Sequence, residues 1–417
     1  MSSRADAAAE GEGEPASLDV RGAMWRYSLA SGLVWAAFAA VTYGSTYMLE
    51  LGLSSMDVGV MLVAGNVLAM LVQPRIASTA DARSGPSIRA MSVALALATA
   101  ALCAACLASH AAWLLIGAFG LTYLTSRNIQ ALSNSTSVYY INRGARINYG
   151  VARGIGSVAF AAVSAVLGAM MDALGPDVVV WSAIALSLAL AASLALMPTP
   201  KDVPALGERP GNGHDDGRGY LAFCRENPRL MLVFLGFGLL SIPALVTTTY
   251  GKPVVESIGA DVGVMGVAIA ISAASELPMM AVSSRLERRF SVSALMRFAA
   301  VGCVLKCVVI TVAPTVPVLY AGYALQVLGY ALYTPVCVTY ANLLFGEGDK
   351  NKAVGLLTMT NTVGGIIGNL LGGVLIETMG VLPFMLACCA VSVAGMLLAF
   401  AGMERVGRVG RQRAAEA

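Results

Sequence analysis

Apolar residues occur in long runs from one end of the chain to the other, and short polar segments separate these runs. Each run approaches the ~20 residues that a helix needs to cross the hydrocarbon core of a bilayer. The pattern therefore predicts twelve membrane-spanning helices. We expect the spans at Met24–Leu49, Val58–Ile76, Ile88–Ala108, Ala112–Val138, Asn148–Met171, Val178–Leu196, Leu230–Tyr250, Val262–Val282, Ala294–Val312, Val316–Leu344, Ala353–Ile376 and Phe384–Ala401.

A polar stretch at the middle of the chain divides these spans into two sets of six. It contains the run Gly-Asn-Gly-His-Asp-Asp-Gly, which is typical of a linker. The first twenty residues lack a basic start followed by an apolar run, so we expect no cleaved signal peptide. We expect a disordered cytoplasmic tail at 1–21, a six-helix bundle at 22–197, a cytoplasmic linker at 198–229, a second six-helix bundle at 230–403 and a cytoplasmic tail at 404–417.

The fifth and eleventh spans resemble each other at a constant spacing of 205 residues. The matched pairs are Gly150 and Gly355, Gly168 and Gly373, Asp172 and Glu377, and Gly175 and Gly380. Two parallel repeats of six helices place a binding site between the halves, near the middle of the membrane. The fold class that we expect is an all-α membrane protein with two pseudo-symmetric six-helix bundles.

The basic residues predict the orientation of the spans. With both termini in the cytoplasm, the basic residues outside the spans fall in the tails or in cytoplasmic loops, except Lys252. Arg127, Arg153 and Lys306 lie inside spans. Cytoplasmic loops carry such an excess of Lys and Arg, which predicts a multi-pass protein of the inner membrane with both termini cytoplasmic.

The composition excludes several classes of protein. Hydrophobic residues make up 57% of the chain, charged residues 12%, and the mean hydropathy is +0.74, which excludes a soluble enzyme. The net charge of +3 is too small and too dispersed to predict nucleic-acid binding. The two histidines, His110 and His214, lie outside the spans, so we expect no metal, no cofactor and no membrane-embedded enzyme.

The loop after the second span resembles the signature loop of the major facilitator superfamily. It reads Gln73-Pro74-Arg75-Ile76-Ala77 and continues to Asp81, Arg83, Gly85 and Arg89, with Ala77 in place of the first glycine. The resemblance implies a secondary transporter in which Asp81, Arg83 and Arg89 form an ion-paired latch between helices. It implies a structural role for these residues and no contact with the transported solute.

A more specific resemblance is to the branch that includes lactose permease, nucleoside–proton symporters and phenylpropionate permease-like proteins. The fifth span begins with Tyr149-Gly150-Val151-Ala152-Arg153-Gly154-Ile155-Gly156, similar to the Gly-x-x-Arg-x-x-Gly segment of that branch. The resemblance implies that Arg153 contacts the solute and that Glu276 and Lys306 occupy a charged region. The acid of the fourth span and the His and Glu of the tenth span of lactose permease are absent, so galactoside specificity and that proton route do not carry over.

The residue types inside the spans also point to a polar interior. An ionised side chain at the bilayer centre costs at least ~2.5–3.5 kcal/mol, so each one needs a reason. Glu276 and Lys306 lie on adjacent spans at depths that allow an ion pair, which either fixes packing or opens during transport. Glu276 is the acid placed deeply enough to carry a proton.

Polar and aromatic residues at helical spacing give a candidate solute site. We expect it to contain Trp35, Arg127, Gln130, Arg153, Gln326, Tyr330, Tyr333 and Asn361. Tyrosine and tryptophan rings with polar groups suit a ring-shaped solute, and the excess of buried cations favours an anionic one. The alternatives are hydrogen bonds between helices for the stripe around Arg127, packing for the tyrosines, and extension of Arg153 to the headgroups.

The sequence therefore predicts a secondary transporter. We expect proton-coupled symport of a small organic solute that is anionic, nucleoside-like or aromatic, by an alternating-access mechanism. We expect the protein to be a monomer whose partners are the lipid bilayer, the solute and the proton. A proton-coupled exporter of drugs or metabolites is the alternative, because no sequence feature fixes direction. A receptor or scaffold is disfavoured by the paired halves and the charged interior.

Overall fold

The computed structural model describes residues 20–81, 86–141, 147–197 and 220–409, and every regular element within these ranges is a helix. The first half contains α1 (Val20–Thr42), α2 (Gly44–Glu50), α3 (Ser55–Asp81), α4 (Ile88–Ala108), α5 (Ala112–Ile141), α6 (Tyr149–Leu174) and α7 (Val178–Ala195). The second half contains α8 (Tyr220–Glu226), α9 (Pro228–Thr249), α10 (Gly251–Glu256), α11 (Val262–Arg289), α12 (Val292–Thr311), α13 (Val316–Ala324), the 3₁₀ turn η1 (Leu325–Val327), α14 (Tyr330–Leu344), α15 (Glu347–Thr358), α16 (Thr360–Met379) and α17 (Val381–Gly402).

Short polar side chains set where several helices begin. Ser87, Asn148, Asp261 and Ser291 each precede a helix and accept a hydrogen bond from the main-chain N–H three residues on. These N–H groups have no partner inside the helix, so a capping side chain satisfies them. The polar breaks between the apolar runs thus fix the first turns of α4, α6, α11 and α12.

Twelve helical paths cross the structure, as the apolar runs predict. Eleven of them, within the described residues, are long and apolar enough to span a membrane. The twelfth is α5, which has 30 residues but carries the polar stripe around Arg127. Its lower apolar content is consistent with a helix that faces a polar interior along one side.

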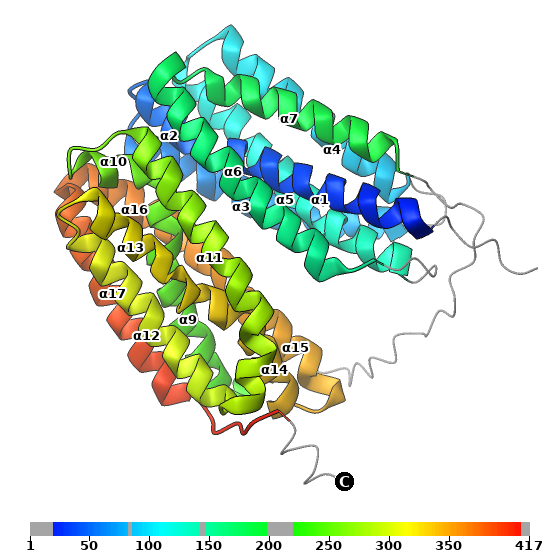
Figure 1. The fold of residues 1–417 in the computed structure, drawn as a ribbon, viewed down its shortest axis with the longest axis vertical. Coiled ribbons are helices and arrows are strands. Elements are labelled where there is room, and N and C mark those ends of the chain that lie inside the picture. Colours follow the sequence, from blue (N-terminus) through cyan, green and yellow to red (C-terminus); the bar gives the residue numbers. More distant parts are fainter. Residues whose placement is uncertain (1–19, 82–85, 142–146, 198–219, 410–417) are drawn as a thin grey trace, which may run out of the picture.

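The helices form two bundles that approach each other at one end and diverge toward the other (Figure 1). Helix α6 of the first half packs against α11 of the second, and α3 packs against α16. The bundles separate toward the end where α1 begins and where the chain leaves α17 (Figure 1). The expected all-α fold with two pseudo-symmetric six-helix bundles is confirmed. The predicted tail at 1–21 and linker at 198–229 lie largely outside the described residues.

The two halves, which repeat each other in sequence, also end equivalent helices with the same backbone geometry. Gly175 directly follows α6 and has φ of 89°, and Gly380 directly follows α16 and has φ of 83°. The two glycine N–H groups donate to Met171 and Ile376, which are themselves 205 residues apart. Positive φ is the conformation in which glycine ends a helix without steric cost, which explains why both halves keep it.

Two acidic side chains join the bundles at the closed end. Asp172 on α6 accepts a hydrogen bond of 2.7 Å from the main-chain N–H of Gly263, in the first turn of α11. Glu377 on α16 accepts one of 3.1 Å from the N–H of Met56, in the first turn of α3. A carboxylate is stabilised at a helix N-terminus because the free N–H groups and the helix dipole both favour negative charge. The matched acids of the repeat therefore cap helices of the opposite bundle.

Glycines let the same helices touch. A Cβ atom at Gly168 would lie 2.8 Å from the carbonyl oxygen of Val262, and one at Gly373 would clash with the carbonyl oxygen of Ser55. A side chain at either position would therefore push a backbone away. Small residues at helix contacts permit this close approach in membrane proteins.

Two tyrosines also occupy equivalent positions in the two halves. Each lies where the first membrane-spanning helix of its half is interrupted. Tyr43, between α1 and α2, donates a hydrogen bond of 2.7 Å to the carbonyl of Ser164. Tyr250, between α9 and α10, donates one of 2.7 Å to the carbonyl of Asn369, which is 205 residues after Ser164. Each bond satisfies a buried carbonyl beside the boundary between bundles.

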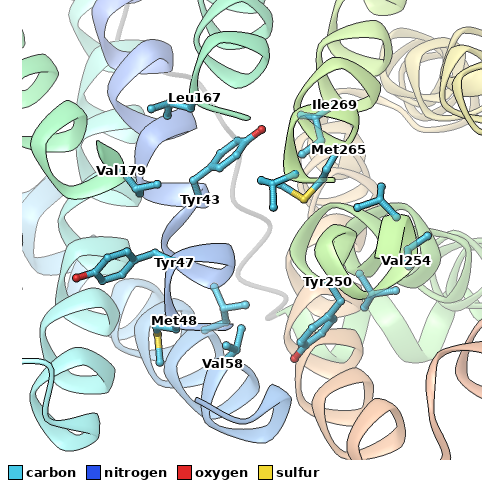
Figure 2. Close-up of a cluster of buried hydrophobic side chains, with 14 of the residues drawn as sticks. Tyr43, Tyr47, Met48, Val58, Leu167, Val179, Tyr250, Val254, Met265 and Ile269 are labelled. Carbon is cyan, nitrogen blue, oxygen red and sulfur yellow. The ribbon is translucent and has the colours of Figure 1, made fainter. Parts of the chain in front are cut away.

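We call the contact surface between the two bundles at the closed end the seam. It consists of Tyr43, 55–59, 164–172, Tyr250, 262–266 and 369–377. Apolar side chains from both bundles form a buried cluster along the seam, with Tyr43, Tyr47, Met48 and Val58 on one side and Val254, Met265 and Ile269 on the other (Figure 2). Because burial of apolar surface stabilises contacts over their whole area, the seam closes this end of the molecule.

Candidate functional site

A cavity of about 270 Å³ lies between the bundles, next to the seam. Helices α1, α3, α5 and α6 line one side, and α9, α11, α12, α14, α16 and η1 line the other. Six of the residues expected at the solute site line it, as do both residues of the expected charged pair: Trp35, Arg127, Arg153, Glu276, Lys306, Gln326, Tyr330 and Asn361.

Arg127, in the middle of α5, extends into the cavity. Its side chain is exposed there, and its guanidinium carbon lies 4.9 Å from the ring centre of Phe38 on α1. A guanidinium over an aromatic face gains a cation–π attraction. In the part of the chain that the structure describes, Arg127 has no hydrogen-bond acceptor and no carboxylate at ion-pair distance.

Arg153, near the start of α6, is held by its own bundle. Its Nη1 donates a hydrogen bond of 2.7 Å to the hydroxyl of Ser157, one turn further on. Its guanidinium carbon lies 3.9 Å from the ring centre of Trp35. Gly156 leaves the space that this ring fills, because a Cβ there would collide with it. The Gly-x-x-Arg-x-x-Gly segment thus supplies both Arg153 and the space in which the Trp35 ring packs against it.

The second bundle presents a linked acid, amide and amine. Nζ of Lys306 donates a hydrogen bond of 2.8 Å to Oε1 of Gln326, and Nε2 of Gln326 donates one of 3.1 Å to Oε1 of Glu276. The expected contact between Glu276 and Lys306 is therefore indirect, with the amide of Gln326 between them. Glu276 also interacts electrostatically with Arg153 across the boundary between bundles.

A break in the tenth span places Gln326 in this position. Helix α13 ends at Ala324, η1 follows, and Gly329 has φ of −94° and ψ of −106° before α14 begins. Gly302 on α12 allows the broken segment to come close, since a Cβ there would lie 2.5 Å from the carbonyl oxygen of Leu328. Broken helices at the middle of a membrane are tolerated where they line a cavity. The irregular turn therefore brings Gln326 between Glu276 and Lys306.

The rest of the second wall offers uncharged polar groups. Thr248, Thr362 and Asn361 line it, together with Asn369. Asn369 is 6% exposed, and its Oδ1 has no hydrogen-bond partner among the described residues. A buried acceptor without a partner is costly, so a donor from a bound solute would stabilise it.

Sequence reasoning missed part of the aromatic wall. Phe38, Tyr123 and Phe160 line the cavity beside Trp35. The ring centres of Phe38 and Phe160 lie 6.2 Å apart, and those of Phe38 and Tyr123 also 6.2 Å. Isolated phenylalanines in apolar helices carry no signal that separates a cavity from lipid, whereas Tyr123 belongs to the polar stripe of α5.

Two residues expected at the solute site lie elsewhere. Tyr333 stacks on Phe237 at 3.9 Å between ring centres and donates a hydrogen bond to the carbonyl of Leu357. It is 1% exposed and does not line the cavity, because the break at Gly329 changes the helical register after Gln326. Gln130 does not line the cavity either, and its Nε2 is buried without a partner among the described residues.

The latch residues are only partly described. Arg83 lies outside the described residues, and the side chain of Asp81 does as well. Arg89 donates a hydrogen bond of 2.8 Å to the carbonyl of Met197, just after α7. A cation near the C-terminal end of a helix satisfies free carbonyls there, so Arg89 joins α4 to α7 within one bundle.

No group of three or more His, Cys, Asp or Glu side chains suited to a metal ion occurs in the described ranges. What the cavity contains is a guanidinium, a flat aromatic wall and a hydrogen-bonded set of one acid, one amide and one amine.

Comparison with known proteins gives consistent matches. Residues 24–387 match the MFS_1 like family. Maltose permease of Geobacillus stearothermophilus is 27% identical over 281 residues, which cover 66% of this chain and 69% of that protein.

Solved structures share the fold. The nucleoside transporter NupG superposes with a TM-score of 0.76 at 17% identity, over 91% of this chain and 98% of that one. A bacterial homologue of the human lysosomal transporter Spinster, in an inward-facing and occupied conformation, superposes with a TM-score of 0.64 at 12% identity, over 93% and 97% of the two chains. At these identities the likeness establishes the fold alone.

Proposed function

Because the chain belongs to the MFS_1 like family and is a transporter of the major facilitator superfamily, we propose that it carries a small organic solute together with a proton by alternating access. The observation that supports proton coupling most strongly is the set of Glu276, Gln326 and Lys306 in the wall of a cavity that both bundles line. Ionisable residues inside a membrane mark ion and proton pathways.

The position of Glu276 links its charge to the contact between bundles. As a carboxylate it accepts a hydrogen bond from Gln326 and attracts Arg153 of the opposite bundle. Protonation removes the attraction across the boundary and weakens the hydrogen bond, because hydrogen bonds to charged groups are the stronger ones. A proton on Glu276 thus changes the relative free energies of the open and closed arrangements.

The seam is the closed gate of this cycle. The described arrangement is sealed at the seam and diverges toward the end where α1 begins (Figure 1). The placement of Lys and Arg supports an orientation with both termini in the cytoplasm, and in that orientation the described arrangement is open to the cytoplasm. We assign the protein to the inner membrane as a monomer, with bundles at 22–197 and 230–403, a cytoplasmic linker at 198–229 and cytoplasmic tails.

Uptake into proteoliposomes with and without an inward proton gradient tests this function. The panel contains maltose, uridine and aromatic acids, and the variants are Glu276→Gln and Glu404→Gln. Glu404 lies after α17, outside the cavity, so its variant is the matched control.

Wild type and the control variant are expected to accumulate a solute above its equilibrium level when the gradient is present. Glu276→Gln is expected to lose accumulation and keep exchange of solute between the two sides, because solute binding survives while the proton acceptor is gone. Full accumulation by Glu276→Gln contradicts the coupling role. If the solute accumulates only when the proton gradient is reversed, the protein is a proton-coupled exporter and the symport proposal is wrong.

A further inference from the structure

The three cationic side chains that line the cavity, Lys306, Arg153 and Arg127, differ in how many protein groups bind them. Lys306 is 5% exposed and bonded to Gln326, and Arg153 is bonded to Ser157, stacked on Trp35 and attracted by Glu276. Arg127 has only the face of Phe38. Its N–H donors therefore point into the cavity without an acceptor among the described residues.

A guanidinium inside a membrane protein attracts an anion strongly. The surrounding groups screen charge less than water does, so an opposite charge at contact distance gains more than it would in solution. The planar fork of N–H donors matches a carboxylate, with two parallel hydrogen bonds. A single free arginine suits one carboxylate better than a doubly charged phosphate, which would need a second accessible cation.

The groups around Arg127 constrain the rest of the solute. Phe38, Tyr123 and Phe160 form an apolar wall beside it, with ring centres of neighbouring rings 6.2 Å apart. Flat rings pack on such walls in offset or edge-to-face geometry. The solute therefore needs a planar apolar body next to its anionic group.

The opposite wall adds one more requirement. Asn369 presents a buried Oδ1 without a hydrogen-bond partner among the described residues, and Asn361 and Thr362 lie on the same helix. An O–H or N–H donor at the far end of the solute satisfies this acceptor. Binding of such a donor removes the cost of a buried unpaired oxygen.

We propose that the transported solute is a flat-ringed carboxylate with a hydrogen-bond donor opposite the carboxylate, and that Arg127 binds the carboxylate. This inference rests on the transport function proposed above and narrows its substrate class. Arg127 is the specificity-determining residue in this account, and Asn369 selects the donor at the other end.

Binding to the purified full-length protein tests the inference without relying on transport. The probes are 4-hydroxybenzoate, benzoate, 4-hydroxybenzamide, uridine and maltose, measured by calorimetry with wild type, Arg127→Ala, Arg127→Lys and Arg285→Ala. Arg285 is exposed on α11 and does not line the cavity, so its variant controls for the loss of an arginine. Thermal unfolding of each variant checks that it folds.

We expect wild type to bind 4-hydroxybenzoate most tightly. The amide and Arg127→Ala are each expected to weaken binding about tenfold to a hundredfold, as for loss of a charged hydrogen bond. Arg127→Lys is expected to recover part of the affinity, and Arg285→Ala is expected to bind like wild type. Benzoate, which lacks the donor, is expected to bind about threefold to tenfold more weakly than 4-hydroxybenzoate.

Three results would overturn the inference: equal binding of acid and amide, unchanged binding by a folded Arg127→Ala variant, or binding of maltose or uridine alone. The last result leaves the transport function standing if that solute accumulates with the proton gradient. Failure of every bound solute to accumulate contradicts the transport function itself and leaves the binding result intact.

Discussion

The seam and the cavity are neighbours, yet they differ in symmetry. In the seam, Asp172 and Glu377 perform the same task from the two halves, and so do Gly168 and Gly373. In the cavity, the residues at the repeat spacing of 205 from Arg153 and Glu276 are Thr358 and Leu71, which carry no charge.

The difference separates two roles of a duplicated fold. Closing one end needs the same contact twice, because two bundles that rock about a pseudo-twofold axis meet along equivalent helices. The proposed binding of a solute and a proton uses different groups at the two walls, as suits a solute whose two ends differ. Variants in the seam should therefore act in equal pairs, whereas variants in the cavity should act singly.

The largest effect in the seam is expected from Gly168→Ala and Gly373→Ala. Each added Cβ meets a backbone carbonyl, and overpacking of this kind costs ~1–3 kcal/mol. The sealed arrangement should lose population by about fivefold to a hundredfold in each variant. The measurement is the labelling rate of Ser272→Cys, in the cavity of an otherwise cysteine-free protein, by an impermeant maleimide from the sealed side.

Gly117→Ala is the matched control for this pair, because a Cβ there meets no atom within 4 Å. We expect its labelling rate to equal that of the parent. A change in only one of the two seam variants would break the equivalence of the halves.

A smaller effect is expected from Asp172→Asn and Glu377→Gln. Each loses a negative charge at the first turn of a helix in the opposite bundle, which is worth ~0.3–1 kcal/mol. The same labelling rate should rise about twofold to fivefold in each variant, and the effects should multiply in the double variant. If labelling stays at the parental rate in both, the two caps do not contribute to closure.

The smallest effect on closure is expected from Tyr43→Phe and Tyr250→Phe. Each hydroxyl donates a hydrogen bond of 2.7 Å to a carbonyl of its own bundle, and the loss of this bond, ~0.5–1.5 kcal/mol, reduces bundle stability. The Tyr250 hydroxyl also lies 3.3 Å from the carbonyl oxygen of Ser55 in the opposite bundle, so Tyr250→Phe should open the seam slightly more than Tyr43→Phe. Thermal unfolding temperatures should fall by similar amounts in both. Tyr320→Phe is the control, because the Tyr320 hydroxyl has no hydrogen bond to another described residue.

The sequence predicts the fold well because long apolar runs leave few alternatives to membrane helices. The match of Asp172 with Glu377 and of Gly175 with Gly380 also indicates the duplication before any coordinates are known. Gly168 and Gly373 could be identified as packing residues, but nothing in the sequence says which carbonyl each one meets. Contacts between bundles depend on the rocking angle, which the local pattern does not encode.

The cavity is predicted less completely. Arg127 and Arg153 stand out because charge is rare in spans, whereas Phe38 and Phe160 resemble any lipid-facing residue. Tyr333 follows the helical spacing of Gln326 and Tyr330, but the break at Gly329 turns it away. The amide of Gln326 bridges Glu276 and Lys306 only because the helix is broken at Gly329. The sequence pattern of this span is that of a continuous helix and does not reveal the break.

Two spin-label distances measured in one experiment test the central claim that the seam and the opposite end open in alternation. One pair, at Trp113 and Leu382, reports on the sealed end, and the other, at Trp25 and Phe290, reports on the open end. Each pair joins exposed positions on opposite bundles. The Asp172→Asn, Glu377→Gln double variant is compared with its cysteine-free parent. The account predicts a longer distance for the first pair and a shorter one for the second. Lengthening at the sealed end with no shortening at the other would contradict it.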